Sequence, residues 1–146
     1  MTRPDLSSGS PPLFAVLTVV AVGGAVGACL REVVTLSVPA SSSQFPWSTY
    51  SVNVVGSFLL ALLPAFEVIR RRPLLPPLIG TGLLGGFTTF SAYSEQTRSL
   101  YASGHQVTAG VYLLGTLASC LVAVMVAARL STRSSQAEFE SEEGDL

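Results

Sequence analysis

The chain alternates between long stretches that hold no charged residue and short clusters that do. Asp, Glu, Lys and Arg are absent from residues 6–30, 33–66, 73–94 and 99–128, which together make up 111 of the 146 residues. A helix needs about 20 apolar residues to cross a bilayer. The pattern therefore predicts an all-α membrane protein with four transmembrane helices and no sizeable domain outside the membrane.

Turn-forming and charged residues set the predicted boundaries. We expect helices over residues 13–34, 47–69, 74–100 and 106–130, with a turn-forming loop over residues 37–46. Residues 1–12 are rich in Ser, Pro and Gly and predict a flexible N-terminus. Residues 131–146 hold five acidic side chains and one aromatic, which predicts a disordered acidic C-terminal tail. The transmembrane domain then covers residues 13–130.

The third apolar segment is too rich in glycine to predict one regular helix. Four glycines fall within residues 80–86, and the hydroxyl-bearing Thr88, Thr89 and Ser91 follow almost directly. We expect the helix to break near residues 85–89. Irregular backbone at membrane depth is tolerated only where protein or a watery cavity covers it, and broken helix ends can face ions. The match of this segment to a dinucleotide-binding fingerprint is rejected, because that motif follows a strand.

Small residues in the first helix predict close helix packing. Gly23, Gly24, Gly27 and Ala28 repeat at a spacing of four, which lets helices approach closely. This pattern indicates packing or dimerisation rather than chemistry. The two cysteines, Cys29 and Cys120, lie inside apolar stretches without further metal ligands at suitable spacing, and we interpret both as small buried hydrophobes.

Composition and charge narrow the class of protein. Only 12% of the residues are charged, against about 25% in an average soluble domain. This value excludes a soluble globular enzyme, a disordered chain and a nucleic-acid binder. Four crossings put six arginines on the side of both termini and two, Arg31 and Arg98, on the other. Because arginines in short loops favour the cytoplasm, we expect cytoplasmic termini in a multi-pass protein of the cell membrane.

Candidate chemistry rests on polar groups rather than charges. No Asp, Glu, His, Lys or Arg lies deep in a predicted span, which disfavours an intramembrane enzyme or a proton-coupled exporter. Asn53 is a buried amide, and such a group is costly in hydrocarbon unless it is paired or faces a polar cavity. Hydrogen-bond donors, weakly positive ring edges and the lack of fixed negative charge favour passive conduction of a small anion.

Three sequence blocks resemble the Fluc/CrcB family of small fluoride channels. The first is a glycine-rich helix over residues 23–31 that ends in Arg31. The second spans residues 49–58 and contains Thr-x-x-Val-Asn-x-x-Gly-Ser-Phe, with Asn53 at its centre. The third is the break itself, Gly-Gly-Phe-Thr-Thr-Phe-Ser over residues 85–91. The blocks follow in the family's order, and the resemblance covers roughly residues 13–130.

The resemblance implies an inverted-topology dimer with fluoride pores, which exports fluoride passively from the cytoplasm and limits its toxicity. It implies a structural Na⁺ at the dimer centre, held by the backbone carbonyls of Gly85 and Thr88. It also implies a set of side chains along the fluoride pathway: Asn53, Phe90, Tyr93, Tyr112, Thr116, Thr49 and Arg31.

Two features depart from the family pattern. Tyr93 stands where the family usually has Phe, and the added hydroxyl bears on whether that pore conducts. The arginine asymmetry does not suit an identical pair inserted in opposite directions. We therefore expect this subunit to insert one way and to pair with an oppositely oriented homologue. A proton-coupled four-helix exporter and a non-conducting partner subunit of a heterodimeric channel stay open as alternatives.

Overall fold

The computed structural model describes residues 11–41 and 43–143, with side chains up to residue 131. Within these residues every regular element is helical, so the predicted all-helical class is confirmed. In chain order the elements are α1 (Leu13–Ser37), α2 (Trp47–Leu62), η1 (Leu63–Ala65), α3 (Glu67–Arg71), η2 (Pro77–Leu84), α4 (Gly85–Phe87), α5 (Phe90–Ala102) and α6 (Gln106–Glu143).

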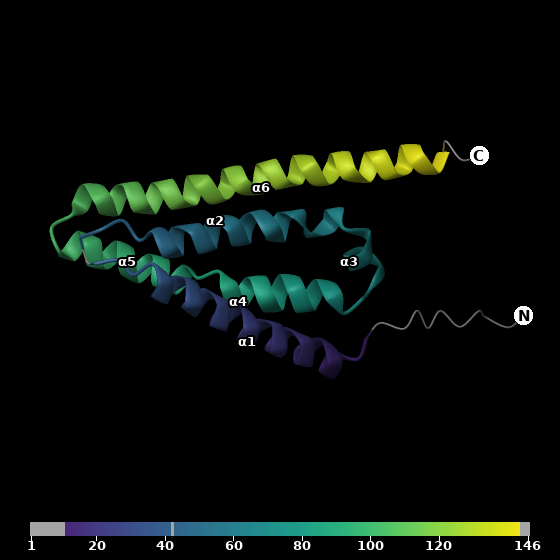
Figure 1. Ribbon diagram of the computed structural model, residues 1–146, viewed down its shortest axis with the longest axis horizontal. Coiled ribbons are helices and arrows are strands. Elements are labelled where there is room, and N and C mark those ends of the chain that lie inside the picture. Colours follow the sequence, from purple (N-terminus) through teal and green to yellow (C-terminus); the bar gives the residue numbers. More distant parts are fainter. Residues whose placement is uncertain (1–10, 42, 144–146) are drawn as a thin grey trace, which may run out of the picture.

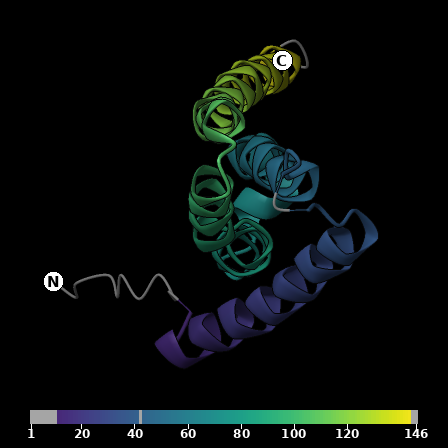
Figure 2. The same ribbon diagram turned by 90° about the vertical axis from the view of Figure 1, so that its left-hand side faces the viewer.

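The helices lie side by side as an elongated bundle (Figure 1). α2 packs along α6, and α5 packs against the first half of α6. α1 packs on η2 and α4, on the side of the bundle away from α6 (Figure 2). The start of α1, the short α3 and the far end of α6 all lie at one end of the bundle (right in Figure 1).

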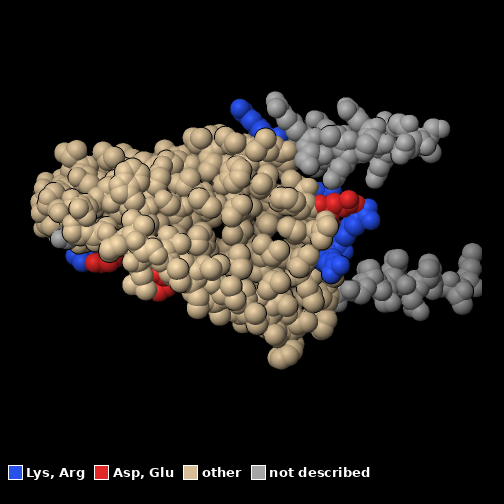
Figure 3. Space-filling view, in the orientation of Figure 1, with Lys and Arg blue, Asp and Glu red and all other residues tan. Residues whose placement is uncertain are grey.

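Three helices in the described part of the chain are long and apolar enough to cross a membrane: Leu13–Ser37, Trp47–Ala65 and Gln106–Ser131. Large apolar side chains such as Phe14 (82% exposed) and Val107 (83% exposed) stand on the outside of the bundle. On the face shown in Figure 3, charged side chains gather toward the two ends and leave an uncharged surface between them. The chain is therefore a helical membrane protein.

The second helix ends earlier than predicted. The sequence predicts a helix to residue 69, whereas α2 ends at Leu62 and the chain continues through η1 into α3. Pro64 lies in η1, and proline has no N–H to continue the helical hydrogen bonds. The Pro64 carbonyl instead accepts a hydrogen bond from Arg70 Nη1 at 2.5 Å. The predicted end was wrong because Pro64 acts as a break inside an apolar run.

Glycines of the third segment pack against glycines of α1. A side chain added at Gly82 would lie 2.9 Å from the Val20 carbonyl oxygen and 3.1 Å from the Gly23 Cα. Gly27 and Gly86 likewise face backbone atoms of the opposite helix, with no room for a side chain. The predicted close packing is thus confirmed, and it is made within one chain.

The third segment breaks within the predicted residues 85–89, at Thr88 and Thr89. Residues 77–87 remain helical, as the π-helical η2 followed by α4. Thr88 (φ −77°, ψ 156°) and Thr89 (φ −147°, ψ 122°) are extended, and α5 begins at Phe90. The predicted break is therefore confirmed, and the glycines before it stay helical where they pack on α1. The two helical parts lie nearly end to end alongside α2 (Figure 1).

The last helix begins at the predicted Gln106 and runs beyond the predicted end near residue 130. Its backbone is helical to Glu143, where the sequence predicts a disordered tail. Extending an existing helix adds one hydrogen bond per residue without a new nucleation cost. The side chains of residues 132–143, residues 144–146 and the predicted flexible residues 1–10 lie outside the described part of the chain.

Candidate functional site

The broken third segment is held by the side chain of Asn53 from α2. Asn53 Oδ1 accepts the Thr89 N–H at 2.8 Å, and Asn53 Nδ2 donates to the Thr89 carbonyl at 3.0 Å. A backbone break in a membrane leaves an N–H and a C=O that need partners. The Asn53 amide supplies both, so it takes the place of the missing helical hydrogen bonds.

The threonine hydroxyls form hydrogen bonds with backbone groups at the two helix ends that meet at the break. Thr88 Oγ1 donates to the Leu84 carbonyl at 3.0 Å, at the end of the first helical part. Thr89 Oγ1 accepts the Ala92 N–H at 3.2 Å and so caps the start of α5. Because α5 has 13 residues, its N-terminus carries the partial positive charge of a helix dipole at the break.

A cavity of about 250 Å³ lies beside the break, between α2, α5 and α6. None of the described residues that line it is charged. Its wall consists of Asn53, Ser57, Leu60, Thr88, Thr89, Phe90, Tyr93, Thr116, Leu117 and Cys120. The wall is mainly apolar, with a few polar groups converging from three elements, as is typical of a small-ligand site.

Two hydroxyl groups on the α6 side of this cavity differ in their partners. Tyr93 is only 8% exposed, and its hydroxyl donates to the Leu113 carbonyl of α6 at 2.5 Å. Thr116 is 3% exposed, and its hydroxyl oxygen has no hydrogen-bond partner among the described residues. A buried hydroxyl without a partner costs free energy. A hydrogen bond to a guest in the cavity would remove this cost for Thr116.

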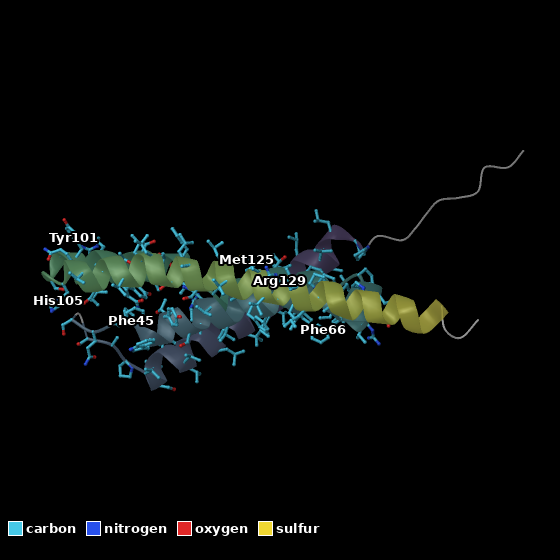
Figure 4. The ribbon with its side chains drawn as sticks, turned by 90° about the horizontal axis from the view of Figure 1, so that it is seen from above. Phe45, Phe66, Tyr101, His105, Met125 and Arg129 are labelled. Carbon is cyan, nitrogen blue, oxygen red and sulfur yellow. The ribbon has the colours of Figure 1, made fainter. Side chains whose placement is uncertain are left out.

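A row of aromatic rings leads away from the cavity toward one end of the bundle. The ring centroids of Phe90 and Tyr93 are 5.9 Å apart, those of Tyr93 and Tyr112 5.3 Å, and those of Tyr112 and Phe45 5.2 Å. The Tyr112 hydroxyl donates to Gln96 Oε1 at 2.8 Å. In Figure 4, Phe45 lies toward the end of the bundle that holds His105, away from Arg129.

The cavity brings together four of the seven residues predicted for an ion pathway: Asn53, Phe90, Tyr93 and Thr116. Tyr112 is fully buried in contact with Tyr93 and does not line the cavity wall. Thr49 is 2% exposed, one helical turn before Asn53, and also lies outside the wall. The assignment of all seven to a pathway stays a prediction.

Arg31 lies against the helix break instead of lining the cavity. Its Nη1 donates to the Gly86 carbonyl at 3.1 Å and to the Thr88 carbonyl at 3.4 Å. A cation is favourable there because carbonyls at a helix C-terminus lack helical partners. Arg31 thus joins α1 to the break.

The predicted Na⁺ site involves the same region of backbone. Gly85 is exposed, and the Thr88 carbonyl is held by Arg31 only at 3.4 Å. Among the described residues no group of three or more His, Cys, Asp or Glu side chains is placed to hold a metal ion. Backbone carbonyl oxygens are hard donors, which is the ligand chemistry that suits Na⁺.

Sequence reasoning did not assign four residues of this region to the ion pathway: Ser57, Thr89, Gln96 and Cys120. A usable signal existed for Cys120, because Tyr112, Thr116 and Cys120 repeat at a spacing of four on one face of α6. No local signal indicates that Thr89 is the partner of Asn53, since 36 residues separate them.

These features define a class of protein: a helical membrane protein in which a broken helix borders an uncharged, partly polar cavity. The chain belongs to the family of CrcB-like proteins, described as camphor resistance (CrcB), whose model matches residues 18–128.

Several relatives carry the name fluoride-specific ion channel FluC. FluC 1 of Streptomyces coelicolor is 42% identical over 120 residues, which cover 81% of this chain and 78% of that protein. FluC 2 of Nocardia farcinica is 41% identical over 128 residues, 84% of this chain and 91% of that protein. FluC of Alteromonas mediterranea is 42% identical over 125 residues, 82% of this chain and 97% of that protein.

Proposed function

We propose that this chain is a subunit of a fluoride-specific ion channel, which lets fluoride leave the cytoplasm passively. The observation that carries the proposal is the uncharged cavity at the N-terminus of α5, bordered by Asn53 and Thr116. The positive end of a helix dipole favours an anion, and the cavity wall offers no negative charge to repel one. The names of the relatives supply the identity of the anion.

Two donors are available to replace the water that an anion loses. An amide carries two N–H groups, and Asn53 uses one of them on the Thr89 carbonyl. The other N–H and the unpartnered Thr116 hydroxyl both belong to cavity-lining residues. Fluoride is small and accepts hydrogen bonds strongly, so a pair of donors in a mainly apolar wall would compensate part of its lost hydration.

The contacts of Tyr93 favour a conducting pore. A free phenol hydroxyl at this position would be an extra polar group beside the ion. The Tyr93 hydroxyl is instead bonded to the Leu113 carbonyl, so the ring stands in the wall much as a Phe ring would. Ring edges carry weak positive charge, which suits an anion.

The assembly we propose is an antiparallel dimer in the cell membrane. The two helical parts of residues 75–102 together cross the bilayer once, as the fourth span, and the termini face the cytoplasm. Phe90 lines the cavity yet is 80% exposed, which supports a second subunit that covers this side. The six-to-two arginine asymmetry favours an oppositely oriented homologue as that subunit.

A structural Na⁺ would lie between the two subunits in this assembly. The carbonyls of Gly85 and Thr88 from each subunit would hold it, and the ion would lock the two helix breaks together. Exposure of Gly85 and the long Arg31 contact to Thr88 support carbonyls that are available to a cation.

Fluoride efflux from liposomes that contain the full chain, with and without a co-expressed homologue, tests the proposal. We expect efflux that Asn53→Ala and Phe90→Ile each reduce at least tenfold. Thr18→Val is the matched control, because the Thr18 hydroxyl is exposed and bonds only to the Phe14 carbonyl of its own helix. Unchanged efflux in both pore variants would contradict the proposal.

The two alternatives give different results in the same assay. Proton uptake coupled to fluoride flux without an added ionophore would indicate a proton-coupled exporter. A chain that never conducts, even beside a conducting homologue whose rate it alters, would be a partner subunit without a pore of its own.

A further inference from the structure

The cavity contains a thiol that the proposed conduction does not use. Cys120 is a free cysteine on α6, partly exposed, and it belongs to the cavity wall together with Asn53 and Tyr93. It lies one helical turn after Thr116, so the two side chains share one face of α6. The thiol is therefore reached from the cavity instead of being sealed in a packed core.

A second observation indicates that this part of the cavity accepts a polar guest. Thr116 lines the same wall and is 3% exposed, and its buried hydroxyl oxygen has no hydrogen-bond partner among the described residues. Buried hydroxyl groups are almost always hydrogen-bonded to protein or to water. A guest with hydrogen-bond acceptors, such as a sulfonate or an ordered water, satisfies this group beside Cys120.

We propose that Cys120 is a covalent modification site, through which small water-soluble thiol-directed compounds occupy the cavity. With a thiosulfonate, the Cys120 thiol loses its proton to water and the sulfur attacks the sulfenyl sulfur of the reagent. The new S–S bond forms while the S–SO₂ bond breaks, and the sulfinate leaves with the electron pair. The cysteine sulfur is oxidised to a disulfide and the sulfonyl sulfur is reduced to a sulfinate.

The other cysteine provides an internal comparison. Cys29 is exposed on α1, within a helix apolar enough to cross the membrane, and it does not line the cavity. A charged reagent does not partition into the hydrocarbon that surrounds α1. A charged, membrane-impermeant reagent therefore reaches Cys120 through the cavity and leaves Cys29 unmodified.

The experiment treats the full chain in liposomes with 2-sulfonatoethyl methanethiosulfonate and maps the adduct by peptide mass spectrometry without reductant. We expect the adduct on Cys120, its retention in Cys29→Ser and its loss in Cys120→Ser. Fluoride efflux, each protein compared with its own untreated rate, should fall at least tenfold in the wild-type chain and in Cys29→Ser. The rate of Cys120→Ser should not respond to the reagent.

The two readouts separate this inference from the proposed function, on which only the effect on efflux rests. An adduct on Cys120 alone supports the site even if the untreated chain does not conduct. A conducting chain in which Cys120 stays unmodified, or in which Cys29 reacts as fast, would overturn it. So would a loss of efflux that is the same in Cys120→Ser, because the block would then come from elsewhere.

Discussion

At the residue scale, Asn53 holds the helix break in addition to its proposed contact with fluoride. Its amide provides hydrogen bonds to both the N–H and the C=O of Thr89, a residue that is only 9% exposed. The proposed contact with fluoride uses the second Nδ2–H of Asn53, which the bond to the Thr89 carbonyl does not occupy. The same side chain therefore shapes the break and faces the cavity, and variants must be measured for stability as well as for flux.

Replacing Asn53 by Ala should destabilise the protein by about 1–3 kcal/mol, because the Thr89 N–H and C=O lose their partners in a buried position. Thermal unfolding in detergent measures the loss. Thr18→Val, which removes one exposed hydroxyl, should change the midpoint little. An unfolding temperature equal to the wild-type value would show that the break is held by other contacts.

Replacing Tyr93 by Phe distinguishes the contribution of the aromatic ring from that of the hydroxyl, because only the hydroxyl is removed. The ring stays in the cavity wall, so we expect efflux within about twofold of wild type. Loss of the bond to the Leu113 carbonyl should cost about 0.5–1.5 kcal/mol. Tyr101→Phe is the control, since Tyr101 is 65% exposed. Abolished efflux in Tyr93→Phe would show that the hydroxyl takes part in conduction.

At the scale of elements, the glycines of α1 and η2 decide how close two helices come. We therefore expect two Gly→Ala changes, one at this contact and one away from it, to differ sharply in their effect on stability. Gly82→Ala places a methyl group 2.9 Å from the Val20 carbonyl oxygen and should cost about 1–3 kcal/mol. Gly110→Ala in α6 meets nothing within 4 Å.

The Gly110→Ala variant should be neutral or more stable by up to about 1 kcal/mol, because alanine favours the helix over glycine. The thermal unfolding midpoints of Gly82→Ala and Gly110→Ala, measured in the same detergent, test both expectations. Equal midpoints would mean that α1 shifts freely over η2, which would contradict the tight packing described above.

At the scale of the whole molecule, charge placement bears on orientation. Both ends of the described chain and α3, with Arg70 and Arg71, lie at one end of the bundle, while Arg98 lies in α5, which packs on the first half of α6 (Figure 1). This arrangement agrees with the arginine count made from sequence. Arginines in short cytoplasmic loops set the orientation of a membrane protein.

Reporter fusions at the C-terminus should therefore report one orientation, with the terminus in the cytoplasm. Changing Arg70, Arg71 and Arg72 together to Gln should produce a mixture of orientations, because the asymmetry shrinks from six-to-two to three-to-two. Arg98→Gln, which removes a charge from the opposite side, should leave the single orientation intact. A mixture already present in the wild-type chain would contradict the expected one-way insertion.

The pattern of apolar and polar residues is enough to predict which segments enter the membrane and which polar side chains inside them need a partner. Apolar runs are local, so helices Leu13–Ser37 and Gln106–Ser131 follow from composition alone. Asn53 and Thr116 stand out because a polar group in an apolar run must find a partner or a cavity. Three ordered motifs sufficed to indicate the family.

The sequence predicts a break near residues 85–89, but the contacts that hold it and the residues that form the cavity depend on tertiary packing. The glycines of residues 80–86 stay helical because α1 packs on them, and Thr88 and Thr89 are extended because Asn53, 36 residues earlier, bonds to Thr89. The thiol of Cys120 lies in the same cavity wall as Asn53 because α6 packs along α2. Such contacts depend on packing between distant segments, which a local pattern of residues does not encode.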